Sequence, residues 1–189
     1  HWQGNARKAG VAPQISGLTL VGRGATAIPT TEPGALRWSD GAPVAAGSVN
    51  DAVSVSGTGR GFKVTAPADR TPRRLTLFVG ATNASGRLVA HLSDSSASEF
   101  ANMPVRKVGS RWSGVYTLTY HAASPGQTLV VEWIQARGVA SPGKAVPGVS
   151  VQGCYDFVCS AASACSLHKR WSEFKLVIVS DAVHSIKGT

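Results

Sequence analysis

Cysteine is scarce in this sequence and confined to one end of it. The three cysteines are Cys154, Cys159 and Cys165, and the long segment before them contains none. Because three is an odd number, at most one disulfide bond can form within the chain. The spacings between the cysteines match no common zinc pattern, and no nearby pair of histidines completes one. The cysteines therefore disfavour a zinc-binding protein.

Charged residues and long apolar runs are also lacking. Charged side chains make up 15% of the residues, and no apolar run approaches the roughly 20 residues that a membrane-spanning helix needs. Low charge combined with 21 glycines is common in secreted β proteins. The 189 residues suffice for one sizeable core but are too few for two comfortable domains. The chain starts at His1 and shows no signal peptide, so we expect a mature product or a part of a larger extracellular protein.

Acidic residues are the scarcer charges, which leaves a formal net charge of +9. One explanation is a polyanionic partner, either nucleic acid or an acidic polysaccharide, and the other is a solvated basic surface. The local basic clusters are Arg70, Arg73 and Arg74, and Arg106, Lys107 and Arg111. No basic run is interleaved with aromatic residues in the manner of RNA-binding proteins. The pattern favours the solvated surface, and we expect no nucleic-acid partner.

A helical period of 3.6 residues is absent over any useful length before residue 153. Short strand-like runs, several with clean apolar and polar alternation, take its place. These runs are residues 18–22, 36–39, 53–56, 62–66, 75–79, 88–92, 115–120, 128–134 and 149–152. The segment 23–35, rich in glycine, threonine and proline, is expected to form a loop. Many short strands at regular spacing predict a β-sandwich or jelly roll.

The two runs 75–79 and 88–92 are the stretch around which we expect the fold to be organised. A polar loop at 82–86 separates them, which predicts a β-hairpin. Phe78 and Val89 add apolar side chains to the second face, so the hairpin is expected to be covered on both faces as a central pair of strands.

A second hairpin is predicted where Gly57, Gly59 and Gly61 separate two strand-like runs. Clustered glycines also occur in phosphate-binding loops, but such loops lead into a helix. Here another strand follows, so the hairpin is favoured.

The character of the sequence changes at Cys154, where the rhythm of strands and turns ends. We therefore divide the chain into a β-sandwich module at 1–152 and a C-terminal tail at 153–189. One interpretation is that the tail is foreign to the domain, through out-of-frame translation or a junction. The other is a genuine extension whose apolar run Phe174–Val179 joins a sheet edge. If the tail is foreign, this run is an aggregation liability.

Several phrases of the body together resemble a known family. They are residues 1–2, 7–11, 14–16, 38–41, 59–62, 66–71, 92–94, 114–120 and 123–129. As a set they resemble the galactose-binding-like (jelly-roll) β-sandwich modules of secreted bacterial glycoside hydrolases and surface proteins. The resemblance covers about residues 1–152, and the family pattern ends soon after 149–152. It usually begins with an acidic or aromatic segment before the His-Trp pair, which is missing here, so a truncated first strand is expected.

The resemblance implies an all-β fold, a two-layer antiparallel β-sandwich, and a non-catalytic module that binds carbohydrate. Sugar recognition needs an aromatic surface and a few fixed hydrogen-bonding groups. The candidate ligand-binding residues are Trp38 beside Asp40, and Trp112 beside Arg111. Packing in the core is the alternative for both tryptophans, and for Trp133, inside a strong strand, it is the expectation.

A structural calcium ion, which such sandwiches often carry, is the one cofactor considered. Asp94 and Glu99, in a serine-rich loop, are its candidate ligands. Calcium takes six or more oxygen ligands, and the loop has no EF-hand spacing. A solvated loop is therefore favoured over a metal site.

Catalysis is disfavoured, because a glycosidase needs two positioned carboxylates and the acids of the body fall in no recognisable motif. They are Glu32, Asp40, Asp51, Asp69, Asp94, Glu99 and Glu132, of which Glu132 is the one expected to be partly buried. No G-x-S-x-G motif occurs. A structural or adhesive spacer shares the fold and stays open as the alternative. We expect a carbohydrate-binding module whose partners are a glycan and other domains of a parent protein.

Overall fold

The computed structural model describes residues 15–38, 46–103, 111–139, 143, 145–156 and 174–179. For residues 33, 34, 36, 38, 153–156 and 174–179 it describes the backbone alone. The described residues form eleven strands: β1 Thr19–Val21, β2 Ile28–Trp38, β3 Gly47–Ser56, β4 Gly61–Ala68, β5 Arg73–Thr82, β6 Ala84–Leu92, β7 Phe100–Asn102, β8 Arg111–Tyr120, β9 Gln127–Gly138, β10 Gly148–Asp156 and β11 Phe174–Val179.

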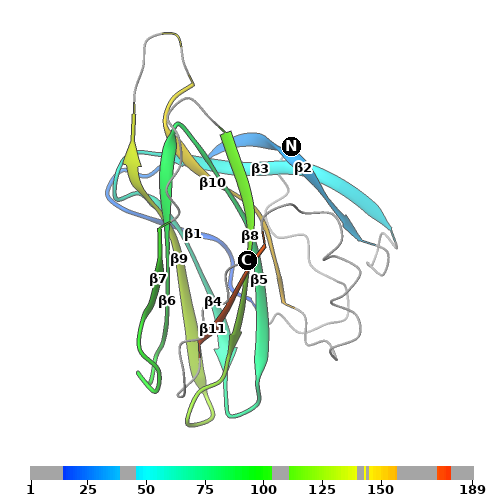
Figure 1. Ribbon diagram of the computed structural model, residues 1–189, viewed down its shortest axis with the longest axis vertical. Helices are drawn as coiled ribbons and strands as arrows, with labels where there is room; N and C mark the ends of the chain where they lie inside the picture. Colours follow the sequence, from blue (N-terminus) through cyan, green and yellow to red (C-terminus); the bar gives the residue numbers. More distant parts are fainter. Residues whose placement is uncertain are drawn as a thin grey trace.

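The strands form two facing sheets (Figure 1). One has the order β1-β4-β9-β6-β7 and the other the order β11-β8-β5-β10-β3-β2. Neighbouring strands are antiparallel except β11, which runs parallel to β8. The strands β3 to β10 form two four-stranded halves, β8-β5-β10-β3 and β4-β9-β6-β7, which is the strand order of a jelly roll. The predicted all-β, two-layer sandwich is confirmed.

The predicted hairpin across β5 and β6 is wrong, because the two strands lie in opposite sheets. A single residue, Asn83, joins them, with a positive φ of 48°. A corner between two sheets leaves the same alternation as a hairpin, since the inward side chains of both strands still meet one core. Each strand is central as expected: β5 lies between β8 and β10, and β6 between β9 and β7.

The second predicted hairpin fails in the same way, because β3 and β4 also belong to different sheets. The turn between them does form. Gly57 and Gly59 have φ values of 116° and 79°, which glycine adopts without strain. The glycines therefore serve a turn between the layers, which a single sequence does not distinguish from a turn between paired strands.

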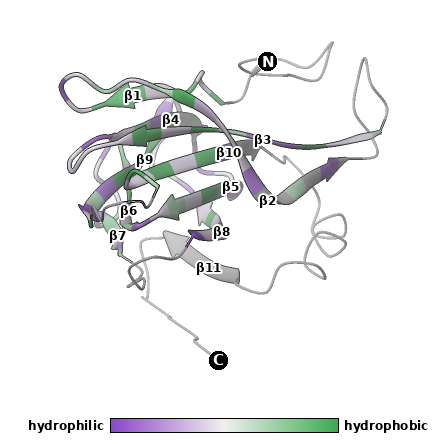
Figure 2. Ribbon diagram, turned by 90° about the horizontal axis from the view of Figure 1, so that it is seen from above, coloured by the Kyte–Doolittle hydropathy of each residue, from purple (hydrophilic) through white to green (hydrophobic). Residues whose placement is uncertain are grey.

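The core lies between the sheets and is built from alternate residues of each strand (Figure 2). Leu75, Leu77 and Val79 of β5 are buried there, opposite Leu88 and Leu92 of β6. Burial of each of these side chains stabilises the fold by about 1.5–3 kcal/mol. The alternation read from the sequence therefore marks the inward face of each strand.

Trp133 of β9 is 1% exposed, which confirms its predicted place in the core. Its indole Nε1 donates a hydrogen bond to the Gly80 carbonyl oxygen of the opposite sheet at 3.1 Å. Its ring lies against Gly86, where an added Cβ would come within 2.0 Å of the Trp133 Cζ2 atom. Glycine is thus required at position 86 to admit the indole.

The segment expected to be a loop at 23–35 is strand from Ile28 onward. β2 pairs with β3 in two stretches, and the register shifts between Thr31 and Leu36. Pro33 and Gly34, which favour a loop in the sequence, lie within this irregular part. Proline is tolerated in β2 because β2 is an edge strand and sits at a bulge there.

The predicted boundary between residues 152 and 153 falls within a strand, because β10 continues to Asp156 after an irregularity between Val151 and Gly153. Beyond it, β11 pairs along β8 at the edge of the six-stranded sheet. This is the arrangement expected of a genuine extension. The separate origin of the tail stays a prediction. Within the described part of the chain, no helix has the length and apolar character to cross a membrane.

The connections gather at the two ends of the sandwich. We call one the Asn83 end, at the top of Figure 1; it comprises residues 22–27, 57–60, 83 and 145–147 and the start of β8. We call the other the Asp94 end, at the bottom; it comprises residues 69–72, 93–99 and 121–126. Both names are used below.

Substitution of Gly86 by alanine tests the packing of the Trp133 indole. The added methyl group must displace the ring or the backbone, so we expect Gly86→Ala to lower the free energy of unfolding by about 3 kcal/mol. Urea unfolding followed by tryptophan fluorescence measures it. Ser85→Ala, at the adjacent position, is the matched control and should change stability by less than about 1 kcal/mol. Equal unfolding midpoints for Gly86→Ala and the wild type would refute this packing.

Candidate functional site

Glu32 is the most deeply buried carboxylate among the described residues, at 4% exposure. It lies on β2 in the irregular stretch between Thr31 and Leu36, where the strand departs from its register with β3. There β2 also contacts β8 and β10, which places the side chain on the outer face of the six-stranded sheet. Glu132 is partly buried, as expected, but Glu32 is buried more deeply, and Asp51, Asp69 and Asp94 are partly buried as well.

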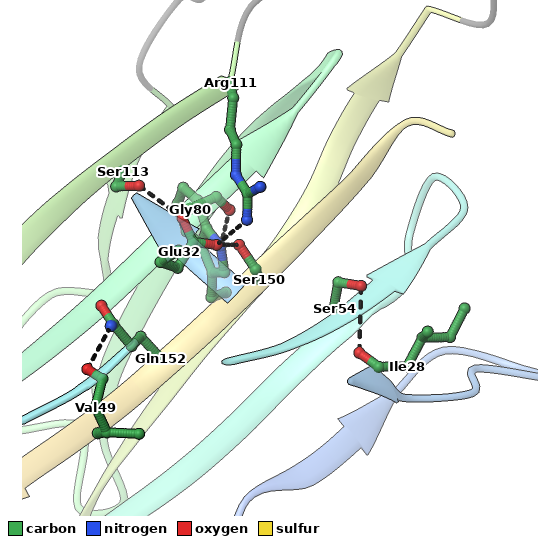
Figure 3. Close-up of polar contacts among 10 residues, drawn as sticks. Ile28, Glu32, Val49, Ser54, Gly80, Arg111, Ser113, Ser150 and Gln152 are labelled. Carbon is green, nitrogen blue, oxygen red and sulfur yellow. Dashed lines mark hydrogen bonds and ion pairs between the residues drawn. The ribbon is translucent and has the colours of Figure 1, made fainter. Parts of the chain in front are cut away.

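Two serine hydroxyls and one guanidinium hold the Glu32 carboxylate (Figure 3). Ser150 Oγ donates to Oε1 at 2.5 Å, and Ser113 Oγ donates to Oε2 at 2.6 Å. Arg111 Nη2 lies 3.5 Å from Oε1. Both oxygens are therefore satisfied by groups of the chain itself. We refer to Glu32, Arg111, Ser113 and Ser150 as the Glu32 cluster.

The register of the sheet assembles this cluster. Gly80 of β5 pairs with Ser113 of β8 on one side and with Ser150 of β10 on the other. The three positions therefore share one face in adjacent strands. A Cβ at Gly80 would lie 2.8 Å from Glu32 Oε1 and 2.5 Å from Ser150 Oγ, so a side chain there would displace the carboxylate.

The Glu32 cluster holds the Arg111 guanidinium in position at the surface. Removing a carboxylate from water is costly unless it is paired and hydrogen-bonded, as Glu32 is here. The Arg111 side chain remains 37% exposed, while its partner in the ion pair is 2% exposed. A guanidinium has five N–H donors, so the contact with Glu32 leaves donors for a polar ligand. The chemistry available is directional hydrogen bonding to hydroxyl or anionic oxygens.

Trp112 follows Arg111 in β8 but points to the opposite face of the strand, because side chains alternate. Its ring packs against the core at 5.8 Å from that of Trp133, with an angle of 44° between the planes. An added Cβ at Gly114 would lie 2.4 Å from the Trp112 Cζ2 atom, so the indole covers this glycine. Trp112 stays partly exposed, at the Asn83 end. The predicted pair therefore meets at a strand end without sharing a face.

The other predicted pair lies largely outside the described residues. Trp38 is the last residue of β2 and its backbone pairs with Gly47, while its side chain is not among those described. Asp40 falls wholly outside the described residues. Their role in ligand binding stays a prediction.

The Asp94 carboxylate links its own loop to the connection at 121–126 through hydrogen bonds. Its Oδ1 accepts hydrogen bonds from the Ser96 hydroxyl at 2.7 Å and the Ser96 amide at 3.1 Å, and its Oδ2 accepts one from the Ala123 amide at 3.2 Å. The bond from the Ser96 side chain is the main reason that the pKa of Asp94 is lowered from 3.8. These contacts give the carboxylate a structural role at the Asp94 end.

Glu99, the other candidate calcium ligand, lies 3.8 Å from Arg87 Nη2. It borders an open hollow of about 430 Å³ between the end of β6 and the following loop. The lining residues are His91, Leu92, Ser95, Ala97, Ser98 and Glu99. Across the described residues, no three His, Cys, Asp or Glu side chains gather as a metal site would need. The geometry gives the calcium prediction no support.

Comparisons with known proteins find short or distant similarity. No family model matches the chain. A probable proline iminopeptidase of Leptolyngbya boryana is 51% identical over 41 residues, which are 22% of this chain and 13% of that protein. The chain thus matches a small fraction of its length.

Three solved structures share a similar arrangement. TmCBM61 in complex with beta-1,4-galactotriose is 12% identical, with 74% of this chain and 87% of that chain covered and a TM-score of 0.42. The CBM22-1 xylan-binding domain of Paenibacillus barcinonensis Xyn10C is 7% identical, with 76% and 87% covered and a TM-score of 0.39. A cyclase of Fischerella sp. TAU is 14% identical, with 80% and 94% covered and a TM-score of 0.41. At these values the similarities decide nothing about function.

Removal of the Glu32 carboxylate tests the Glu32 cluster. Glu32→Ala leaves two buried hydroxyls and Arg111 without their acceptor, so we expect the free energy of unfolding to fall by about 3 kcal/mol. Thermal unfolding followed by circular dichroism measures the loss. Glu132→Ala, at a partly exposed strand position, is the control and should cost less than about 1 kcal/mol. A larger loss in Glu132→Ala than in Glu32→Ala would contradict the structure.

Stability near pH 4 tests the contacts of Asp94. Because the folded pKa lies below the ordinary 3.8, ionised Asp94 stabilises the fold above that pH, and the contribution disappears as the pH falls through the folded pKa. We expect Asp94→Asn to lower the Tm at pH 7, since the one acceptor oxygen of Asn cannot replace both carboxylate oxygens, which accept from Ser96 and from Ala123, and the deficit to shrink below pH 3.8. A deficit that is constant from pH 7 to pH 2.5 would show that the charge is not involved.

Proposed function

We propose that the chain is a carbohydrate-binding module of a larger extracellular protein, without catalytic activity of its own. The proposed site is the start of β8 at the Asn83 end. The observation that carries the proposal is Arg111, exposed at the surface and held by the buried Glu32, directly beside the partly exposed Trp112. The low charge and high glycine content support the extracellular setting.

A glycan hydroxyl must replace water at the hydrogen-bond donors of the protein. This replacement is more favourable when those donors are already ordered. Immobilising a flexible side chain on binding costs about 0.5–1.5 kcal/mol. The ion pair with Glu32 restrains the Arg111 guanidinium before a ligand arrives, and Ser113 and Ser150 restrain Glu32 in turn. The Glu32 cluster is thus a pre-ordered donor site of the kind that polar recognition needs.

Trp112 supplies the apolar part of the proposed site. Its contacts with Trp133 and Gly114 hold the indole in one position, and the part of the ring that stays exposed is the proposed contact for the C–H groups of a sugar ring. Arg111 and Trp112 face opposite sides of β8, so a ligand that touches both crosses the end of the strand. An extended polysaccharide has the length to do so, and Trp38 and Asp40 are proposed as further contacts.

Binding is favoured over the other two functions by the states of Glu32 and Arg111. An acid or base catalyst needs an oxygen that can exchange a proton with a substrate, whereas both Glu32 oxygens accept hydrogen bonds from the chain's own hydroxyls. The Glu32 cluster would also stabilise a spacer, so binding is favoured over that function by the donors that Arg111 leaves exposed at the surface. The sandwich fold itself is compatible with all three functions.

A glycan array probed with the full-length chain tests this proposal, with Arg111→Lys and Arg111→Gln in parallel. Lysine keeps the charge but loses the planar donor fork, so we expect Arg111→Lys to weaken glycan binding about tenfold, or ~1.4 kcal/mol, with little change in Tm. Arg74→Lys, a partly buried position at the Asp94 end, is the matched control.

Equal glycan binding by the wild type and both Arg111 variants would show that the binding site does not lie at the start of β8. Absence of binding to any glycan, by a chain that unfolds cooperatively, would exclude the carbohydrate-binding function and leave the spacer. Trp112→Phe keeps an aromatic ring over Gly114. Weaker glycan binding by this variant, if it stays folded, would show loss of a ligand contact and not loss of folding.

A further inference from the structure

The two ends of the sandwich differ in charge. The described residues of the Asn83 end, taken with two strand residues on either side of each connection, include four arginines and no aspartate or glutamate. These are Arg23, Arg60, Arg111 and Arg137. Glu32, the nearest carboxylate described, lies below this surface and is offset by Arg111. Among its described residues, Arg23, Arg60 and Arg137 therefore give this end an excess of positive charge.

The Asp94 end, counted in the same way, mixes both signs. It includes Arg70, Arg73 and Arg74 together with Asp69, Asp94 and Glu99. Arg73 forms an ion pair with Asp69 at 2.6 Å, and Arg70 donates to the Ala123 carbonyl at 2.9 Å. Arg70 and Arg73 bind the chain itself, as Arg60 does at the Asn83 end through the Ser56 carbonyl. In the described part of the chain, the two ends therefore differ in their balance of charge, which a count from the sequence does not show.

Two of the four arginines lie on either side of the corner at Asn83. Arg111 of β8 pairs with Thr82, the residue before the corner, and Arg137 of β9 pairs with Ser85, two residues after it. One belongs to each sheet, so together they span the gap between the two layers at this end. Both are exposed, as is Arg23 in the connection between β1 and β2. Trp112 lies between the layers beside them.

We propose that the Asn83 end binds the anionic groups of an acidic polysaccharide, either uronate carboxylates or sulfate esters. The inference rests on the proposed carbohydrate-binding function and specifies its ligand class. Guanidinium groups bind carboxylates and sulfates through paired N–H donors, and Arg111 is already oriented for this by Glu32. Spacing the cations over both layers suits a ligand with repeated charges along a chain.

A polysaccharide is favoured over nucleic acid by the aromatic content of this end. Single-stranded nucleic acids are bound by aromatic rings on which successive bases stack flat. Among the described residues of the Asn83 end Trp112 is the one such ring, and its face is occupied by packing on Trp133 and over Gly114. One partly exposed ring can contact a sugar but does not offer the row of rings on which successive bases stack.

Matched polysaccharides that differ in charge test the inference on the full-length chain. The probes are polygalacturonate and its fully methyl-esterified form, and dextran sulfate and dextran, measured by affinity electrophoresis or calorimetry. We expect one acidic member to bind at least about tenfold more tightly than its neutral counterpart, with affinity falling as salt rises from about 0.05 to 0.5 M. The two pairs tell a carboxylate ligand from a sulfate ligand.

A double substitution, Arg23→Gln with Arg137→Gln, tests the location. Each exposed ion pair contributes about 0.2–1 kcal/mol, so we expect roughly a fivefold loss of affinity for the acidic probe and no change for the neutral one. Arg70→Gln with Arg74→Gln removes the same charge at the Asp94 end and is the control. It should leave binding within about twofold of the wild type, apart from the small effect of net charge.

The outcomes separate the inference from the function on which it rests. If a neutral glycan binds as tightly as its acidic counterpart, the inference is overturned and the carbohydrate-binding function stands. Equal losses in the two double variants also overturn it, because the effect is then one of net charge. If oligo(dT) binds as tightly as the acidic probe, the end is a general polyanion site and the glycan inference fails. Binding of no polysaccharide overturns both proposals.

Discussion

Gly80 of β5 takes part in both the core and the proposed site. On the inner side its carbonyl accepts the hydrogen bond of the Trp133 indole, which is central to the core. On the outer side the space left by the missing Cβ seats the Glu32 carboxylate between Ser113 and Ser150. One position in β5 thus couples core packing to the orientation of Arg111. A larger residue there would displace the Glu32 carboxylate and Ser150 on the outer face.

Much of the fold was predictable from the alternation of apolar residues. The runs in β5, β6, β8 and β9 follow the period of two, and their inward residues form the core, with Trp133 among them. Strand pairing was not predictable. The connections at Asn83 and at Gly57–Gly61 carry ordinary turn residues, and a turn leads equally well into a hairpin or across to the facing sheet. Long-range hydrogen bonds, which local sequence does not encode, decide between them.

The candidate site could be predicted in part, and its role in binding stays a prediction. Arg111 and Trp112 were identified by their adjacency, which favours a shared surface, but alternation along β8 sends them to opposite faces. Glu32 was missed because Pro33 and Gly34 indicate a loop, and its partners Ser113 and Ser150 lie far away in the sequence. A buried glutamate in an irregular edge strand has no local signature. Glu32 directly before Pro33 and Gly34 is the one sequence feature that a search for irregular edge strands could use.

The pairing of β3 with β10 has a consequence for how such a unit is carried within a longer polypeptide. These are the first and last strands of the jelly roll, they are antiparallel neighbours, and their outer termini both point away from the Asn83 end. The polypeptide can therefore enter and leave the eight-stranded unit at the same end, opposite the Asn83 end. In the proposed module, a domain attached there would lie away from Arg60, Arg111 and Arg137 at the Asn83 end. Arg23 and Glu32 precede β3 in the chain, so the proposed site is complete only when β2 and the connection before it accompany the eight-stranded unit.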